Sequence, residues 1–219
     1  MEYSLDWSVI PQNMDAILEG LWLTLQISAL ALLISIPIGI LAGLLRISRN
    51  HFISFLATSY IEFIRGVPLL VLLLWIYFVL NQFLHLGAYW SAIIGLAFFS
   101  GSFIAEIVRA GIESVPRGQM EAARSSGMNY ITAMRLIILP QAFRKVLPPM
   151  ASQFIILIKD SSLVSVISVA DLTLAGKNIV GTTFRSLEVW TFIALLYFAM
   201  TFIISQVIRF LEKKYKVAE

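Results

Sequence analysis

Apolar residues gather along the chain into long runs separated by short polar stretches. The runs cover residues 21–45, about 54–80, 89–108, 147–170 and 189–210. Each is close to the ~20 residues that a helix needs to cross the hydrocarbon core of a bilayer. The runs lack the alternation of a transmembrane β-strand, and only helices and closed barrels satisfy their backbone hydrogen bonds in lipid. The pattern predicts an all-α integral membrane protein with five transmembrane helices.

Composition supports this prediction. The 219 residues are 59% hydrophobic and 13% charged, with a mean hydropathy of +0.86, whereas soluble domains are roughly 45–50% apolar. The chain has no cysteine, and His51 and His85 are isolated, so no disulfide framework, thiolate site or metal site is expected. The net charge of +3 requires no nucleic-acid partner. Acidic residues precede the first run, which is longer than the core of a signal peptide, so we expect an uncleaved first span.

The positions of Lys and Arg predict the orientation. Of 16 such residues, 12 lie in residues 46–51, 109–145 and 209–219. Loops rich in these residues stay in the cytoplasm. We therefore expect the N-terminus outside, the C-terminus inside and residues 109–146 as a cytoplasmic loop.

Small residues and prolines mark special points in the first two runs. Ser35, Gly39 and Gly43 recur every four residues and form a stripe that allows close helix packing. Gly66 and Pro68 predict a break in the second run.

The loop at residues 109–146 reads as two short helices joined by a turn. Pro116 suits the start of a helix, and Gly127 suits its end because glycine adopts the left-handed conformation without steric cost. Asn129 is a candidate cap for a second helix, which Pro140 is expected to end. Periodicity leaves two interpretations open: an amphipathic helix on lipid headgroups, or a helix that docks in a protein groove.

The spacing within this loop resembles a known motif. Glu121-Ala122-Ala123 is followed by Gly127 and by Ile138-Leu139-Pro140. This arrangement resembles the EAA loop of bacterial ATP-binding-cassette (ABC) importer permeases, whose coupling helix docks into a cleft of a cytoplasmic ATPase. The residues that the resemblance assigns to coupling are Glu121, Ala122, Ala123, Arg124, Gly127 and Pro140.

Three stretches narrow the resemblance to the polar amino-acid branch of that family, with its histidine-, arginine- and glutamine-type permeases. They are YIEFIRGVPLL (60–70), SVPRGQMEAARSSGM (114–128) and IKDSSLVSVISVADL (158–172). The KDSSL serines stand where a threonine-serine pair is more usual, which keeps the hydroxyl. The resemblance covers essentially the whole chain and implies a single transmembrane permease domain, residues 1–219, in the lipid of the bacterial inner membrane. It also implies an ATPase subunit that binds ATP and Mg, an extracytoplasmic binding protein, and a second permease copy in a homodimer or heterodimer.

Ionisable residues inside spans are functional candidates because burying a charge in lipid is costly. Glu62 and Arg65 are three residues apart on one helical face, so they can pair, or Arg65 can bind a carboxylate. Glu106 shares a stripe with Ser102 and Arg109, and Arg109 can neutralise it.

Asp160 lies near the middle of the fourth run. Its neighbour Lys159 points about 100° away around the helix, so the two cannot satisfy each other. Gln153 shares the face of Asp160, and Ser161 and Ser162 add hydroxyls. This set suits the ammonium of an amino acid, and the alternative is a buried pair between Asp160 and Arg65 or another cation. The full set of candidate substrate ligands is Asp160, Ser161, Ser162, Gln153, Ser102, Glu106, Arg65 and Glu62. Unpaired carboxylates here would favour a basic substrate.

The sequence thus predicts the permease subunit of an ABC importer that moves a polar, preferentially basic, L-amino acid into the cytoplasm. No G-x-x-x-x-G-K-[ST] run occurs, so a partner must hydrolyse ATP and the chain is not expected to be an enzyme. The alternative is a secondary transporter driven by an ion gradient, with Asp160 or Glu106 as the coupling carboxylate. Such folds usually contain inverted repeats, and the five runs show none.

Overall fold

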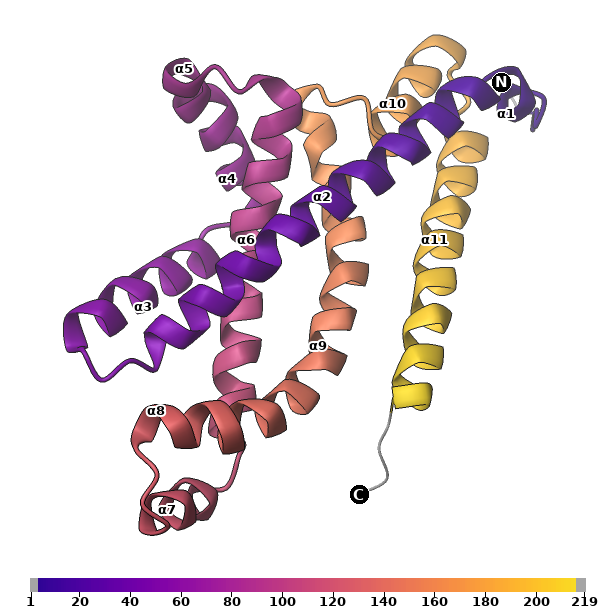
Figure 1. Ribbon diagram of the computed structural model, residues 1–219. Helices are drawn as coiled ribbons and strands as arrows, with labels where there is room; N and C mark the ends of the chain where they lie inside the picture. Colours follow the sequence, from indigo (N-terminus) through magenta and orange to yellow (C-terminus); the bar gives the residue numbers. More distant parts are fainter. Residues whose placement is uncertain (1–3, 216–219) are drawn as a thin grey trace. The chain divides into compact units, whose positions relative to one another are not determined.

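The structure is a computed structural model that describes the backbone of residues 4–215 and the side chains of residues 4–210. Every regular element in the described part is helical, including two π-helices (η1, η2) and one 3₁₀-helix (η3) (Figure 1). In chain order the elements are α1 (Val9–Gln12), α2 (Met14–Arg46), α3 (His51–Gly66), α4 (Leu69–Trp75), η1 (Ile76–Leu80), α5 (Asn81–Leu84), α6 (Gly87–Glu113), α7 (Arg117–Ser125), α8 (Tyr130–Ala133), η2 (Met134–Ile138), α9 (Leu139–Asp160), η3 (Ser161–Ile167), α10 (Leu172–Thr183) and α11 (Ser186–Tyr215). The end of the EKKYK tail, from Lys216, lies outside the described residues.

The helices confirm an all-α membrane fold. Within the described residues, four stretches are long and apolar enough to cross a membrane, namely Met14–Arg46, Gly87–Glu113, Tyr130–Ile167 and Ser186–Phe210. Helix α3 and the continuous helical segment from α4 through η1 to α5 (Leu69–Leu84) supply a fifth span if they are counted as one broken span. The break falls where the sequence predicts it: Val67 is extended and Pro68 directly precedes α4. The residue before a proline avoids the helical conformation, which explains why α3 ends there.

The described residues form two compact units. The first unit comprises residues 4–32, 68–96 and 154–215, and the second comprises residues 33–67 and 97–153.

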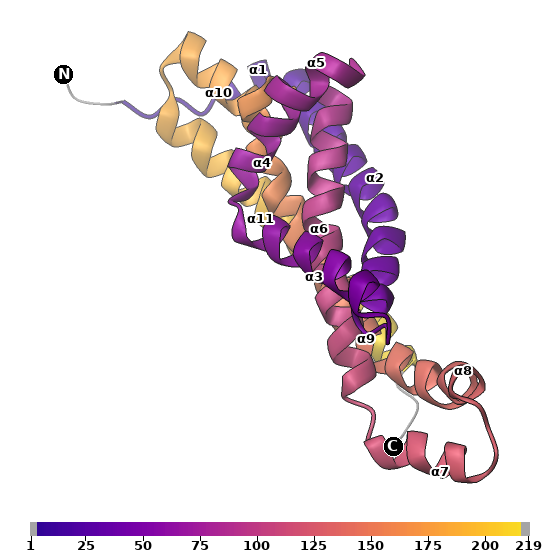
Figure 2. The ribbon, with the colours of Figure 1, turned by 90° about the vertical axis from the view of Figure 1, so that its left-hand side faces the viewer.

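The first unit has an apolar core contributed by α1, α2, α9, α10 and α11. Ile17, Ile158 and Leu172 are fully buried in it, and α10 packs against α11 (Figure 2). The hydroxyl of Thr24 accepts a hydrogen bond from the Leu172 backbone N–H at 3.1 Å. Asp171 caps α10 by accepting from the Leu174 N–H at 2.9 Å. These contacts fix the loop that follows η3 against α2.

The second unit is built where the C-terminal half of α2 packs on α3 and on the later part of α6. Ala42, Ile61 and Ala105 form a small buried cluster there. Gly43 lies against α6 so closely that a Cβ atom would stand 2.7 Å from the Ala105 carbonyl oxygen. The Tyr60 hydroxyl donates to the Phe98 carbonyl oxygen at 2.9 Å. The stripe of small residues therefore serves packing within this bundle.

Candidate functional site

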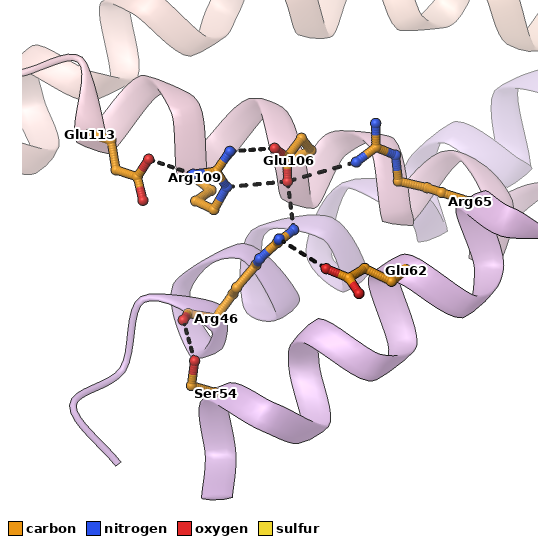
Figure 3. A network of polar contacts seen from close by, with 7 residues as sticks. All are labelled: Arg46, Ser54, Glu62, Arg65, Glu106, Arg109 and Glu113. Carbon is orange, nitrogen blue, oxygen red and sulfur yellow. Dashed lines mark hydrogen bonds and ion pairs between the residues drawn. The ribbon is translucent and has the colours of Figure 1, made fainter. Parts of the chain in front are cut away.

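Three guanidinium groups converge on the carboxylate of Glu106 in the second unit (Figure 3). Arg46, the last residue of α2, donates from Nη1 to Glu106 Oε2 at 2.7 Å. Arg109, one turn along α6, donates from Nε to Oε2 at 3.2 Å and from Nη2 to Oε1. Arg65, near the end of α3, places its Nη1 3.9 Å from Oε2. One carboxylate thus ties together three helices.

Two further carboxylates complete this network. Arg46 Nη2 lies 3.5 Å from Glu62 Oε1, and Arg109 Nη1 pairs with Glu113 Oε2. The network contains equal numbers of guanidinium and carboxylate groups, so its net charge is zero (Figure 3). Hydrogen-bonded pairing of this kind offsets the desolvation cost of charges at the edge of a membrane span.

The network confirms one predicted pair and corrects another. The pair between Glu106 and Arg109 is present. The predicted pair between Glu62 and Arg65 is wrong in the described part of the chain, because Glu62 pairs with Arg46 and Arg65 turns to Glu106. Arg65 also stacks over the Phe103 ring, 5.2 Å from its centre. Arg65 therefore pairs with a residue of α6 instead of with Glu62 on its own helix.

Sequence reasoning missed the role of Arg46. In the sequence, Arg46 is one of the cationic residues that indicate the orientation of the chain. Its position at a helix end does not show which distant carboxylate it pairs with. Arg46 and Glu106 are 60 positions apart.

Asp160 lies in the first unit, at the point where the α-helix α9 gives way to the 3₁₀-helix η3. Its side chain is half-buried, whereas Lys159 is exposed, as their directions around the helix predict. The Ser161 hydroxyl donates to the Ile158 carbonyl oxygen and the Ser162 hydroxyl to the Lys159 carbonyl oxygen, each at 2.7 Å. Both hydroxyl hydrogens are therefore used, and the oxygens retain lone pairs that can accept from an ammonium group.

Gln153 and Ser102 belong to the second unit, and both are buried. The Ser102 hydroxyl donates to the Phe99 carbonyl oxygen at 2.6 Å. The structure therefore groups Glu62, Arg65 and Glu106 in one network, and it places Asp160, Ser161 and Ser162 together at the α9–η3 junction.

The EAA run lies on α7, a helix that is almost entirely exposed. Glu121, Ala122 and Arg124 are exposed, while Ala123 is the buried residue of this helix. The turn after α7 is a Schellman motif: Met128 N–H bonds to the Ala123 carbonyl oxygen and Gly127 N–H to that of Arg124, each at 3.1 Å. Gly127 has a φ of +86°, which confirms the predicted glycine stop.

The second half of the loop begins as predicted and continues differently. Asn129 caps α8 by accepting from the Thr132 N–H at 2.8 Å. Pro140 was expected to end this helix, and that expectation is wrong because η2 and α9 carry the helix on to Asp160. The wider π-turn directly before α9 accommodates the missing N–H and the ring of proline. The Gln141 side chain donates to the Ile137 carbonyl oxygen at 2.8 Å, which supplies a further donor at this turn.

Contacts at its base hold the loop together. The Lys145 ammonium donates to the Ser114 carbonyl oxygen at 2.8 Å, and α7 packs against α8 and η2. We call residues 114–145 the elbow. The contact between Lys145 and Ser114 joins the two ends of the elbow, and the outer surface of α7 is exposed.

Comparison with known proteins identifies this arrangement. Residues 35–217 match the family described as the inner membrane component of binding-protein-dependent transport systems. The chain is 38% identical over 215 residues to the glutamine transport system permease protein of Escherichia coli (strain K12), covering 97% of this chain and 98% of the relative. It is 34% identical over 221 residues to the glutamate/aspartate import permease protein of Escherichia coli O6:H1, covering 97% and 99%.

A solved structure gives the same result. A crystal structure of an amino acid ABC transporter with histidines superposes with a TM-score of 0.91 at 40% sequence identity, covering 97% of this chain and 100% of that one. The agreement covers 97% of this chain in both sequence and fold. The protein is therefore a member of the binding-protein-dependent transport system inner membrane component family, a non-catalytic membrane subunit.

Proposed function

We propose that this protein is the permease subunit of an ABC importer that carries a polar amino acid into the cytoplasm, with ATP and Mg bound by a separate ATPase subunit. Family membership and relatives named for glutamine and for glutamate/aspartate transport support an amino-acid substrate. The observation that carries the proposal is the exposed EAA run on α7, a helix that buries little of its surface within the chain.

The elbow is the proposed contact with the ATPase. Glu121, Ala122 and Arg124 offer charge and a small residue on the outer surface of α7, as a helix that docks in a groove requires. The Gly127 turn fixes the direction in which the chain leaves α7. Movement of the ATPase would thereby shift the helices that enter and leave the elbow between two states.

The proposed substrate contact is the α9–η3 junction. The Asp160 carboxylate would bind the substrate ammonium, and Ser161 and Ser162 would accept hydrogen bonds from it. Gln153 and Ser102 belong to the second unit, and their role as substrate ligands stays a prediction from the sequence.

Because Glu62, Arg65 and Glu106 are already paired within the network around Glu106, we assign them a structural role. Asp160 then remains to supply the negative charge that would favour a basic substrate.

The proposed assembly contains two permease copies, ATPase subunits and an extracytoplasmic binding protein. The family description names a binding-protein-dependent system, and five spans are few to enclose a pathway. The N-terminus is proposed to face outside and the elbow to face the cytoplasm, in line with the distribution of Lys and Arg.

Uptake into proteoliposomes containing the chain and its ATPase tests the coupling proposal. Uptake should require ATP and be lost in Glu121→Ala and Gly127→Ala. Gly118→Ala is the matched control: a Cβ at Gly118 or at Gly127 meets nothing within 4 Å, but only Gly127 has a positive φ. Uptake that persists without nucleotide and follows a proton or sodium gradient would instead identify a secondary transporter.

A second experiment tests the substrate site. Asp160→Asn should weaken uptake of arginine or histidine by about tenfold or more, because a charge-assisted hydrogen bond is lost. Lys159→Gln, on the exposed side of the same helix, is the control and should leave uptake unchanged. Equal uptake by Asp160→Asn and the wild type would remove Asp160 from the site.

A further inference from the structure

The second unit contains an open pocket of about 470 Å³ beside the network around Glu106. It lies between the end of α2, the start of α3, the end of α6, and α8 with η2. Ile47, Ile112 and Met134 provide apolar walls. The polar lining consists of Arg46, Arg109, Glu113, Ser54, Thr58 and Tyr130. This volume falls within the range of ligand-binding pockets, roughly 300–1,000 Å³.

The ends of two apolar helices are expected to place the pocket at the depth of the lipid headgroups. The apolar run of α2 ends at Arg46, and α6 becomes charged between Glu106 and Glu113. Both ends are on the side of the protein rich in Lys and Arg. Charged pockets between spans at this level are suited to lipid headgroups.

Helix α3 places apolar surface directly beside the pocket. Ser54 and Thr58, one turn apart, line the pocket. Phe52, Phe55 and Leu56 on the same helix are 68%, 66% and 52% exposed. In a bilayer these side chains contact acyl chains, so a molecule with a polar head and an acyl tail matches both surfaces.

The pocket offers charges of both signs. Arg46 and Arg109 bring guanidinium groups with several N–H donors each, which suit phosphate oxygens. Arg49 stacks 4.3 Å from the centre of the Tyr130 ring and adds positive charge nearby. Glu113 is 54% exposed and can accept from an ammonium group. Glu113 already pairs with Arg109, and its exposed part can take a second cation, which a purely anionic headgroup would not supply.

We propose that this pocket binds the headgroup of an aminophospholipid, with phosphatidylethanolamine as the model ligand. Arg46 and the Thr58 hydroxyl bind the phosphate, and Glu113 binds the primary ammonium. Tyr130 belongs to α8 and Met134 to η2, so the bound lipid braces the segment that follows the Gly127 turn. The site stands independently of the proposed transport function.

Native mass spectrometry of the purified full chain from nanodiscs tests the proposal. The nanodiscs contain equal amounts of phosphatidylethanolamine, phosphatidylcholine and phosphatidylglycerol with identical acyl chains. The ethanolamine lipid should be retained in preference to the other two. Phosphatidylcholine has the same phosphate and a cation but no N–H donor, and phosphatidylglycerol has hydroxyl donors but no cation. Neither can therefore make a charge-assisted hydrogen bond to Glu113.

Variants separate the two halves of the headgroup. Glu113→Gln should reduce ethanolamine-lipid retention to the level of the choline lipid, about three- to tenfold. Thr58→Val should weaken all three lipids alike, because it removes a contact to the phosphate. Glu62→Gln removes a carboxylate of the same network outside the pocket lining, and Ser59→Ala changes an exposed neighbour on α3; both should retain the preference.

Three results would overturn the proposal. They are equal retention of all three lipids by the wild type, a preference for phosphatidylglycerol, and unchanged retention in Glu113→Gln. Displacement of the ethanolamine lipid by free arginine or glutamine would assign the pocket to an amino acid instead. Glu113 is exposed, so Glu113→Gln is expected to fold. Its elution volume and apparent Tm check this.

Discussion

Gly39 on α2 lies so close to Ile104 on α6 that a methyl group at its Cα would overlap the isoleucine side chain. The same methyl group would stand 2.8 Å from the Gly101 carbonyl oxygen. The backbone oxygen cannot move aside without displacing α6. This contact therefore sets the distance between the two helices in the second unit.

Gly39→Ala should destabilise the protein by about 1–3 kcal/mol, the usual cost of overpacking a close contact. The measurement is unfolding by denaturant in detergent micelles. Gly118→Ala is the control, because a Cβ there meets nothing within 4 Å and alanine favours a helix by up to about 1 kcal/mol over glycine. Equal stability of Gly39→Ala and the wild type would show that α2 and α6 do not pack this closely.

Glu106→Gln should also destabilise the protein, for an electrostatic reason. The carboxylate is paired with Arg46, Arg65 and Arg109, and its side chain is 26% exposed. Removing its charge leaves three guanidinium groups around a neutral amide, which we expect to cost about 1–3 kcal/mol. The apparent Tm and the elution profile on size-exclusion chromatography report the change.

Glu62→Gln provides the matched comparison for Glu106→Gln. Glu62 contacts one guanidinium and is 66% exposed, so its loss should cost less than about 1 kcal/mol. If Glu106→Gln kept its stability but lost transport, Glu106 would be a substrate ligand rather than a structural residue.

The elements that depend on local chemistry could be predicted from the sequence. Gly127 ends α7 and Asn129 caps α8 because each residue acts on its own turn. The break near Pro68 follows from backbone sterics in the same way. The prediction that Pro140 ends the helix is wrong because the effect of this proline depends on the preceding π-turn. The sequence contains no clear signal for such a turn.

Ion pairs between residues on different helices could not be predicted from the sequence. Helical spacing allows Glu62 to reach Arg65, but it gives no information about Arg46, which approaches from another helix. A charged side chain selects among several partners according to the distances that the tertiary fold creates. The same limit applies to Asp160: its depth follows from the apolar run, while its partners depend on the packing of other helices.

Lys145→Gln should loosen the elbow without unfolding it. The bond from its ammonium to the Ser114 carbonyl oxygen closes a segment of 31 positions at an exposed site, so its loss should cost about 1 kcal/mol or less. Amide hydrogen exchange in residues 114–129 should become roughly two- to fivefold faster. Arg144→Gln, at the exposed neighbouring position, should leave these rates unchanged, and unaltered exchange in Lys145→Gln would show that the bond does not restrain the elbow.

The N-terminal segment of the first unit should respond to acid through Asp6. Its carboxylate accepts from the Ser8 hydroxyl at 2.6 Å and from the Ser8 N–H at 3.0 Å, while its own N–H donates to Glu188 Oε1 at 2.8 Å. The hydrogen bond from the Ser8 hydroxyl, helped by the Ser8 N–H and by Arg185, lowers the pKa of Asp6 below its ordinary value of 3.8. A lowered pKa means that the ionised carboxylate stabilises the folded state above pH 3.8, and that this contribution is lost as the pH falls through the folded-state pKa.

Asp6→Ala should therefore lower the apparent Tm at pH 6, and the difference from the wild type should shrink progressively below pH 3.8. Ser8→Ala sharpens the test because it removes the first cause of the shift while keeping the carboxylate. In a Ser8→Ala background the Asp6→Ala difference should be smaller at pH 6 and should fade at a higher pH, because the folded-state pKa returns toward the ordinary value. A difference that stays constant from pH 6 to pH 3 would show that Asp6 acts through packing rather than through its charge.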